Sequence, residues 1–98
     1  MTNFDGTMTD RILLDKGSLY KVLYPLKVDS GVLISKDSVI MFVSHYSEKD
    51  LGRYHACANF LHKDSVVVCS MSSKFSYGEA HGCLMLSLTG HLEKVNNT

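Results

Sequence analysis

The chain has 98 residues, of which 45% are hydrophobic, and this is enough for one small domain spanning 1–98 but not for two. Its ten basic and ten acidic residues cancel to a formal net charge of zero, without the surplus of Lys and Arg that binding to nucleic-acid backbones requires. No apolar run is long enough to cross a bilayer and no signal peptide is recognisable, so we expect a cytoplasmic protein whose partner is neither a membrane nor, on charge, a nucleic acid.

The first third of the sequence predicts a strand between turns. Residues 1–10 are polar and predict a loosely ordered tail, with one helical turn at 8–14. From 19 to 28 apolar and polar residues alternate, which is typical of a strand. Pro25 lies inside this segment and predicts an edge position, a bulge or a bend, because proline donates no backbone hydrogen bond. The turns that Gly, Asp and Ser predict in this region lie at 15–18, 29–31 and 35–38.

The remainder predicts short strands separated by polar loops. Residues 39–43 are apolar on both faces, which indicates the central strand of a sheet. Charged residues at 47–52 predict a surface loop with one helical turn, ended by Gly52. The other strands are expected at 32–35, 53–61, 66–71 and 81–88. The polar residues 93–98 predict a second loosely ordered tail.

Short strands at close spacing, with turn residues between them, are typical of a mainly β domain. We therefore predict a small antiparallel barrel of five or six short strands with at most one or two short helical turns. The order of segments resembles that of SH3-like small barrels in the Gly17-x-x-Tyr20 opening, the Pro25-bearing first strand and the Lys36-Asp37-Ser38 turn. The aromatic and acidic groove through which SH3 domains bind peptides is not matched, so the resemblance implies a fold and no ligand.

Two His-x-Cys motifs form the sharpest chemical pattern, His55-Ala56-Cys57 and His81-Gly82-Cys83. On a strand, residues two apart share a face, so each motif presents an imidazole beside a thiol. If the two strands are neighbours, His55, Cys57, His81 and Cys83 supply the two nitrogens and two sulfurs of a tetrahedral zinc site. Zinc sites usually have other spacings and free cysteines are commonly core residues, so we expect no cofactor and keep a zinc-stabilised domain as the alternative.

Cysteine also raises the question of catalysis. Cys57, Cys69 and Cys83 are an odd number in a chain without a recognisable export signal, which favours reduced thiols. Cys57 or Cys83 beside a histidine, oriented by Glu79, would be the nucleophile of a small cysteine enzyme. No oxyanion hole or nucleophile elbow is recognisable in the sequence, and we therefore do not expect an enzyme.

Aromatic and basic residues that flank the charged loops are the candidates for partner binding, because aromatic and arginine side chains dominate the energetics of interfaces. These candidates are Tyr46, Arg53, Tyr54, Phe75 and Tyr77. The same aromatic rings would stack unpaired bases on a small barrel, so a single-stranded nucleic-acid-binding protein is a second alternative. Burial in the core is the competing interpretation for each ring.

Balanced charge, missing catalytic motifs and the exposed edges of strands together favour binding to another protein. We therefore predict a small protein-binding module of the kind with which phages and viruses inhibit or modulate a larger host enzyme or complex, acting in the host cytoplasm. This last step is an analogy of size and style. An unpaired edge strand would also allow a second copy of the chain to bind.

Overall fold

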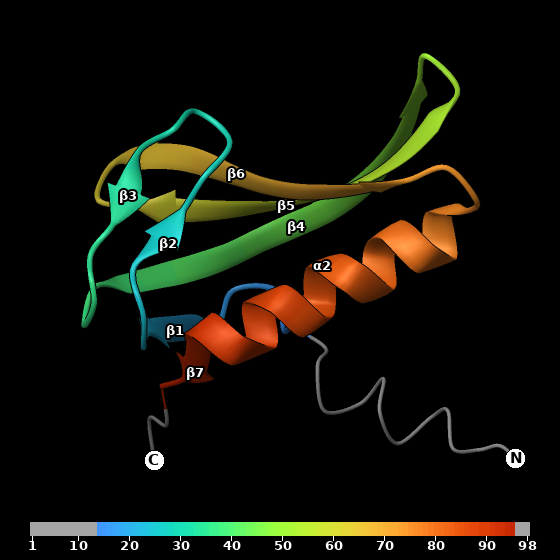
Figure 1. Cartoon of the computed structure of the whole chain (residues 1–98). Helices are drawn as coiled ribbons and strands as arrows, with labels where there is room; N and C mark the ends of the chain where they lie inside the picture. Colours follow the sequence, from blue (N-terminus) through green and yellow to red (C-terminus); the bar gives the residue numbers. More distant parts are fainter. Residues whose placement is uncertain (1–13, 96–98) are drawn as a thin grey trace, which may run out of the picture.

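The computed structural model describes residues 14–95, in which strands predominate and one 15-residue helix stands before the last strand (Figure 1). In chain order the elements are β1 (Leu19–Val22), β2 (Leu26–Lys27), β3 (Leu33–Ile34), β4 (Val39–Asp50), β5 (Arg53–His62), β6 (Ser65–Ser73), α2 (Tyr77–His91) and β7 (Leu92–Lys94). The mainly β prediction is confirmed. The loose tail predicted at 1–10 and most of the helical turn predicted at 8–14 lie outside the described residues.

Five strands form an antiparallel sheet in the order β6-β5-β4-β1-β7, and β2 pairs with β3 in a separate ribbon. The sheet of the described residues is open, with β6 and β7 at its edges, so the SH3-like barrel is not confirmed. β4 and β5 pair along most of their length, with one register shift between Phe42 and Ser44. Such a bulge bends the strand that carries it.

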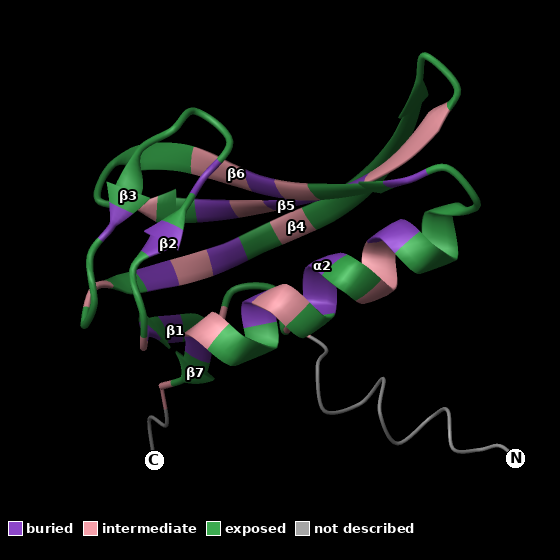
Figure 2. Cartoon of the chain, viewed as in Figure 1, coloured by how far each residue is buried: buried purple, intermediate pink, exposed green. Residues whose placement is uncertain are grey.

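The core lies between one face of the sheet and two covering elements, α2 and the β2–β3 ribbon (Figures 1 and 2). Side chains of a strand point alternately to the two faces, and the covered face of β4 and β5 carries Phe42, Ala58 and Phe60, all fully buried. The residues that the helix and the ribbon add to this cluster are Ala80, Leu84, Met85, Leu88, Leu26 and Ile34.

The strand predicted at 19–28 is broken at Pro25. β1 ends at Val22 and β2 begins at Leu26, and between them the chain leaves the sheet to cross its covered face. The bend expected at Pro25 is therefore confirmed, whereas a continuous strand was wrong. Proline has no backbone N–H to donate to a neighbouring strand, which explains why the pairing stops before it.

The charged segment at 47–52 is not a loop with a helical turn, and that prediction was wrong. β4 continues to Asp50, Leu51 and Gly52 form a two-residue turn, and β5 begins at Arg53. Both turn residues have positive φ, 51° at Leu51 and 77° at Gly52, as a type I′ hairpin turn requires. Charged residues suit this part of β4 because it is exposed on both faces.

The strand predicted at 81–88 was also wrong, because these residues lie within α2, whose 15 residues exceed the one or two turns expected. Ser76 caps the helix, and its Oγ accepts a hydrogen bond of 3.0 Å from the backbone N–H of Glu79. Ser-x-x-Glu is a sequence signature of a helix start. Its buried residues lie on one helix face, three or four positions apart or side by side: Ala80, Leu84, Met85 and Leu88.

The outer edge of β6 is covered at its middle by Asp29, which follows β2. The Asp29 N–H donates to the carbonyl of Val68 at 2.8 Å. The carboxylate of Asp29 accepts two more hydrogen bonds, from the backbone N–H of Ser70 at 3.1 Å and from the Ser70 hydroxyl at 2.7 Å. Asp29 thus satisfies two backbone groups in the middle of β6, the Val68 carbonyl and the Ser70 N–H, that a further strand would otherwise bind.

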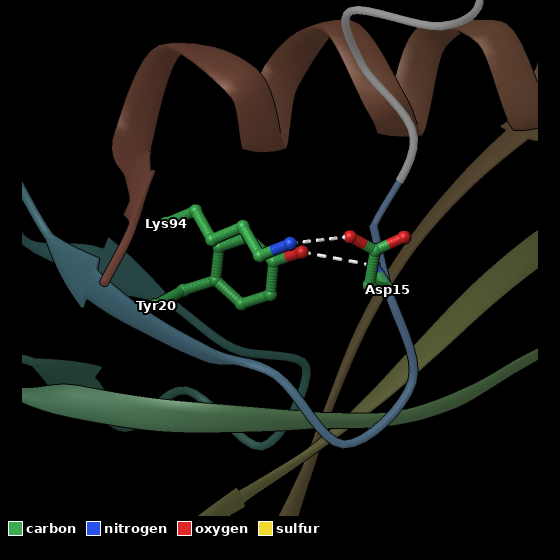
Figure 3. A network of polar contacts seen from close by, with 3 residues as sticks. All are labelled: Asp15, Tyr20 and Lys94. Atoms are coloured by element: carbon green, nitrogen blue, oxygen red, sulfur yellow. Dashed lines mark hydrogen bonds and ion pairs between the residues drawn. The ribbon is translucent and has the colours of Figure 1, made fainter. Parts of the chain in front are cut away.

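The other edge is the short strand β7, which pairs with β1 so that Lys94 lies opposite Tyr20. Figure 3 shows how the turn before β1 is attached to this pair: the Asp15 N–H donates to the Tyr20 hydroxyl at 2.8 Å, and the Lys94 ammonium donates to the Asp15 carboxylate at 2.6 Å. The ion pair is exposed, so screening by solvent leaves it only a small contribution to stability. Glu93 and Lys94 are therefore part of a strand, although a loose tail was expected from 93.

Candidate binding surface

The hairpin that joins β4 to β5 projects from the body of the sheet (Figure 1), and we call residues 46–55 the arm. At its tip, Leu51 has 93% of its surface exposed. Its φ of 51° lies in the left-handed region, which Asn, Asp and Gly occupy readily and a bulky residue rarely does. The tip therefore combines an exposed apolar side chain with an unfavourable backbone conformation.

Aromatic rings gather where the arm meets the start of α2. The rings of Tyr54 and Tyr77 pack edge to face, with centroids 4.8 Å apart and planes at 77°. The Lys49 ammonium lies 4.9 Å from the centroid of the Tyr54 ring, a cation–π contact. Phe75, in the loop between β6 and α2, is 75% exposed. This end of the molecule thus presents aromatic and cationic groups beside the arm.

The predicted partner-binding residues fall on two faces. Tyr54 and Tyr77 are brought together on the helix side of the sheet. Tyr46 and Arg53 lie on the opposite face. Side chains along a strand alternate between its two faces, and Arg53 is next to Tyr54, while Tyr46 is three residues from Lys49, the cross-strand partner of Tyr54. Both are engaged there: the Arg53 guanidinium donates to the Ser72 hydroxyl at 3.2 Å and 3.3 Å, and a hydrogen bond with Cys57 raises the pKa of the Tyr46 hydroxyl.

The sequence prediction missed Leu51 and Lys49. The sequence nevertheless contains a pattern that indicates a hairpin tip. Two positively charged and two negatively charged residues surround the pair Leu51-Gly52, which forms the turn. Asn-Gly and Asp-Gly are the usual hairpin pairs, and a leucine before the glycine masks the pattern.

The sheet face that α2 leaves open carries a second apolar group, here called the outer row. Its members are cross-strand partners on four successive strands, Leu19, Met41, Leu61 and Val66. Leu19, Leu61 and Val66 are exposed, with Val66 at 62%. More than half of the accessible surface of an ordinary folded protein is apolar, so a single row of this kind is not by itself evidence of a binding site. The outer row involves ordinary strand conformations, so it indicates function less strongly than Leu51 does.

The two His-x-Cys motifs do not meet as two neighbouring strands. His55 and Cys57 lie on β5, whereas His81 and Cys83 lie on α2, where residues two apart point in different directions. Among residues 14–95, no group of three or more His, Cys, Asp and Glu side chains is placed to hold a metal ion. The structure thus does not assemble the predicted ligand set, and zinc binding by it stays a prediction.

The three thiols differ sharply in environment. Cys57 and Cys69 are buried, whereas Cys83 is exposed on α2. Burial raises the pKa of the Cys69 thiol to about 12 and also raises the pKa of Cys57, although the hydrogen bond with Tyr46 opposes the change at Cys57. A thiol whose pKa is raised carries less of the reactive thiolate at neutral pH.

Iodoacetamide at neutral pH is therefore expected to modify Cys83 alone in the folded chain and all three cysteines in denaturant. Intact mass spectrometry would count the adducts, and peptide mapping would locate them. The Cys83→Ser variant should gain no adduct while folded. Rapid native labelling of Cys57 would contradict the buried environment and restore interest in a cysteine nucleophile.

Comparison with family models, with curated proteins and with solved structures finds no match for this chain. Within residues 14–95, no helix combines the length and the apolar character needed to cross a membrane.

Proposed function

We propose that this chain is a small protein-binding module, and that it binds a larger protein through the arm and the aromatic residues beside it. In this role it would act as an inhibitor or modulator of its partner, as the sequence led us to expect. The observation that carries the proposal is Leu51, an apolar side chain that is 93% exposed at the tip of a projecting hairpin. Tyr54, Phe75 and Tyr77 would form the adjoining part of the contact.

Leu51 is unfavourable for the stability of the isolated folded chain for two reasons. A left-handed backbone conformation disfavours a bulky side chain by roughly 1–2 kcal/mol, and an exposed leucine contributes nothing to the core. An asparagine at the same position would suit the turn better. Residues held in such conformations cluster at functional sites. Lys63, in the turn between β5 and β6, has the same φ of 51°, so Leu51 is distinguished by combining this conformation with an exposed apolar side chain. A leucine at this position is explained if its side chain is buried in a partner.

The charges around the tip indicate what the partner looks like. Glu48, Lys49, Asp50 and Arg53 surround Leu51 and carry two charges of each sign. A strongly charged partner surface would gain no net attraction from this ring. We therefore propose an apolar pocket with a mixed polar rim, the usual form of the centre of a protein interface.

Replacing Leu51 with asparagine is expected to strengthen the fold and to weaken binding. The free energy of unfolding should rise by up to about 1 kcal/mol, because asparagine tolerates the left-handed conformation. The affinity for the partner should fall at least about tenfold, the usual effect of removing an interface anchor. Urea unfolding measures the first effect. For the second, tagged chain captures its partner from an extract of the source cells, and calorimetry with the purified partner gives the Kd.

The matched control is Leu33→Asn, which removes another exposed leucine on β3, at the other end of the molecule from the arm (Figure 1). This variant should bind like the unchanged chain. Equal binding by the Leu51→Asn variant would exclude the arm as the binding end. Absence of any specific protein partner, together with salt-sensitive binding of single-stranded oligonucleotides, would replace the proposal with the nucleic-acid alternative.

A further inference from the structure

Two histidine side chains from distant parts of the sequence lie beside each other on the side of the sheet that α2 covers. His45 is on β4 and His81 is on α2, with ring centroids 5.3 Å apart and planes inclined at 55°. The ring of His45 also stacks on that of Phe42, with centroids 6.1 Å apart and planes at 13°, which restricts its orientation. His81 is half-buried. The pair thus joins the base of the arm to the helix that carries Tyr77.

The nitrogens of these two rings are free to act as ligands. In the described part of the chain, neither His45 nor His81 forms a hydrogen bond or an ion pair with another protein group. The histidine ring that does form a hydrogen bond is that of His91, with the carbonyl of Ser87. The rings of His45 and His81 thus face each other from two different elements, with no hydrogen bond from residues 14–95 to either ring. A neutral imidazole carries one unprotonated nitrogen, and this lone pair is what binds a metal ion.

The separation of the rings fits a shared ion. Two imidazoles on one tetrahedral metal, with metal–nitrogen bonds of about 2.0–2.1 Å, have ring centroids roughly 5 Å apart. We propose that His45 and His81 together bind one divalent transition-metal ion, Zn²⁺, Ni²⁺ or Cu²⁺, with water in the remaining positions. Imidazole suits these ions, whereas Mg²⁺ and Ca²⁺ require oxygen ligands.

Two protein ligands make this an exchangeable site and not a structural zinc centre, which uses four. The bound ion would link β4 to α2 and hold the base of the arm against the helix. The site shares His81 with the ligand set predicted from the two His-x-Cys motifs, but it excludes His55, Cys57 and Cys83. It does not depend on the proposed protein-binding function.

Thermal unfolding of the metal-free chain tests the site, with ZnCl₂ or NiCl₂ added and with MgCl₂ as the control ion. Zn²⁺ and Ni²⁺ are expected to raise Tm, and Mg²⁺ is not. At an ion concentration of about ten times Kd, the unfolding equilibrium constant should fall about tenfold. In NMR spectra, Zn²⁺ should shift the ring signals of His45 and His81 before those of the other histidines.

The variants His45→Asn and His81→Asn should each abolish the rise in Tm, and His55→Asn and His62→Asn should keep it. His45 is exposed, so its replacement leaves the core intact, and Tm in chelator checks that both variants fold. An unchanged Tm at millimolar Zn²⁺ would overturn the proposal, and so would a rise that survives both substitutions. A rise lost in Cys57→Ser or Cys83→Ser instead would assign the ion to the predicted His-x-Cys set.

Discussion

Replacing Phe60 with alanine is expected to lower the free energy of unfolding by about 3–5 kcal/mol. The side chain is fully buried, and its ring centroid lies 5.6 Å from that of Phe42, its cross-strand partner. The helix covers these rings, so a cavity left by the missing ring can collapse only in part. Small domains are stable by only about 5–15 kcal/mol, so this single change removes much of the total. Urea unfolding followed by circular dichroism measures it.

Val66→Ala is the control. It also shortens an apolar side chain of the sheet, on β6, but this side chain is exposed on the open face and not buried under α2. It is expected to change the free energy of unfolding by no more than about 0.5 kcal/mol. Equal losses at Phe60 and Val66 would contradict the placement of the core on the α2 side alone.

Replacing Asp29 with alanine is expected to destabilise the chain by about 1–3 kcal/mol and to promote self-association. The substitution removes the two hydrogen bonds that the carboxylate accepts from Ser70, and bonds to charged groups contribute more than neutral ones. It also frees part of the β6 edge, and a free edge pairs readily with another chain. Urea unfolding gives the loss of stability, and sedimentation velocity over a range of concentrations gives the association.

Asp64→Ala serves as the control, since it removes an exposed aspartate from the turn between β5 and β6. It should alter neither stability, beyond about 0.5 kcal/mol, nor the sedimentation profile. Asp29→Asn should fall between the two, because the amide keeps one acceptor oxygen. A monomeric and fully stable Asp29→Ala variant would show that the edge needs no such cover.

Local patterns predicted much of the β structure correctly, because turns depend on residues close in sequence. Positive φ at Gly17, Gly31 and Asp37 coincides with turns that Gly, Asp and Ser indicated. The bend at Pro25 has an equally local cause. The arrangement of the strands was not predictable in this way, since the pairing of β1 with both β4 and β7 depends on residues far apart in the chain.

The helix was missed for a different reason. The apolar run at 83–86 fits a buried strand as well as a helix, and a short apolar run cannot decide between them. Ser76 and Glu79 form the helix-start signature, and they would have decided for α2. The error had a direct consequence for the site, because placing His81 and Cys83 on a strand created the expected zinc set. It also hid His45, which meets His81 only because the helix crosses the sheet.

The order of elements along the chain has a consequence for synthesis. The strands β1 to β6 leave the ribosome before α2 and β7 do. Until α2 follows, Phe42 and Phe60 have no helix to cover them, and β1 lacks one of its two neighbours until β7 exists. A nascent chain that ends before residue 77 is therefore expected to be a client of chaperones. The core stays partly exposed, and β1 stays incompletely paired, until Lys94 has left the ribosome and β7 can pair with β1.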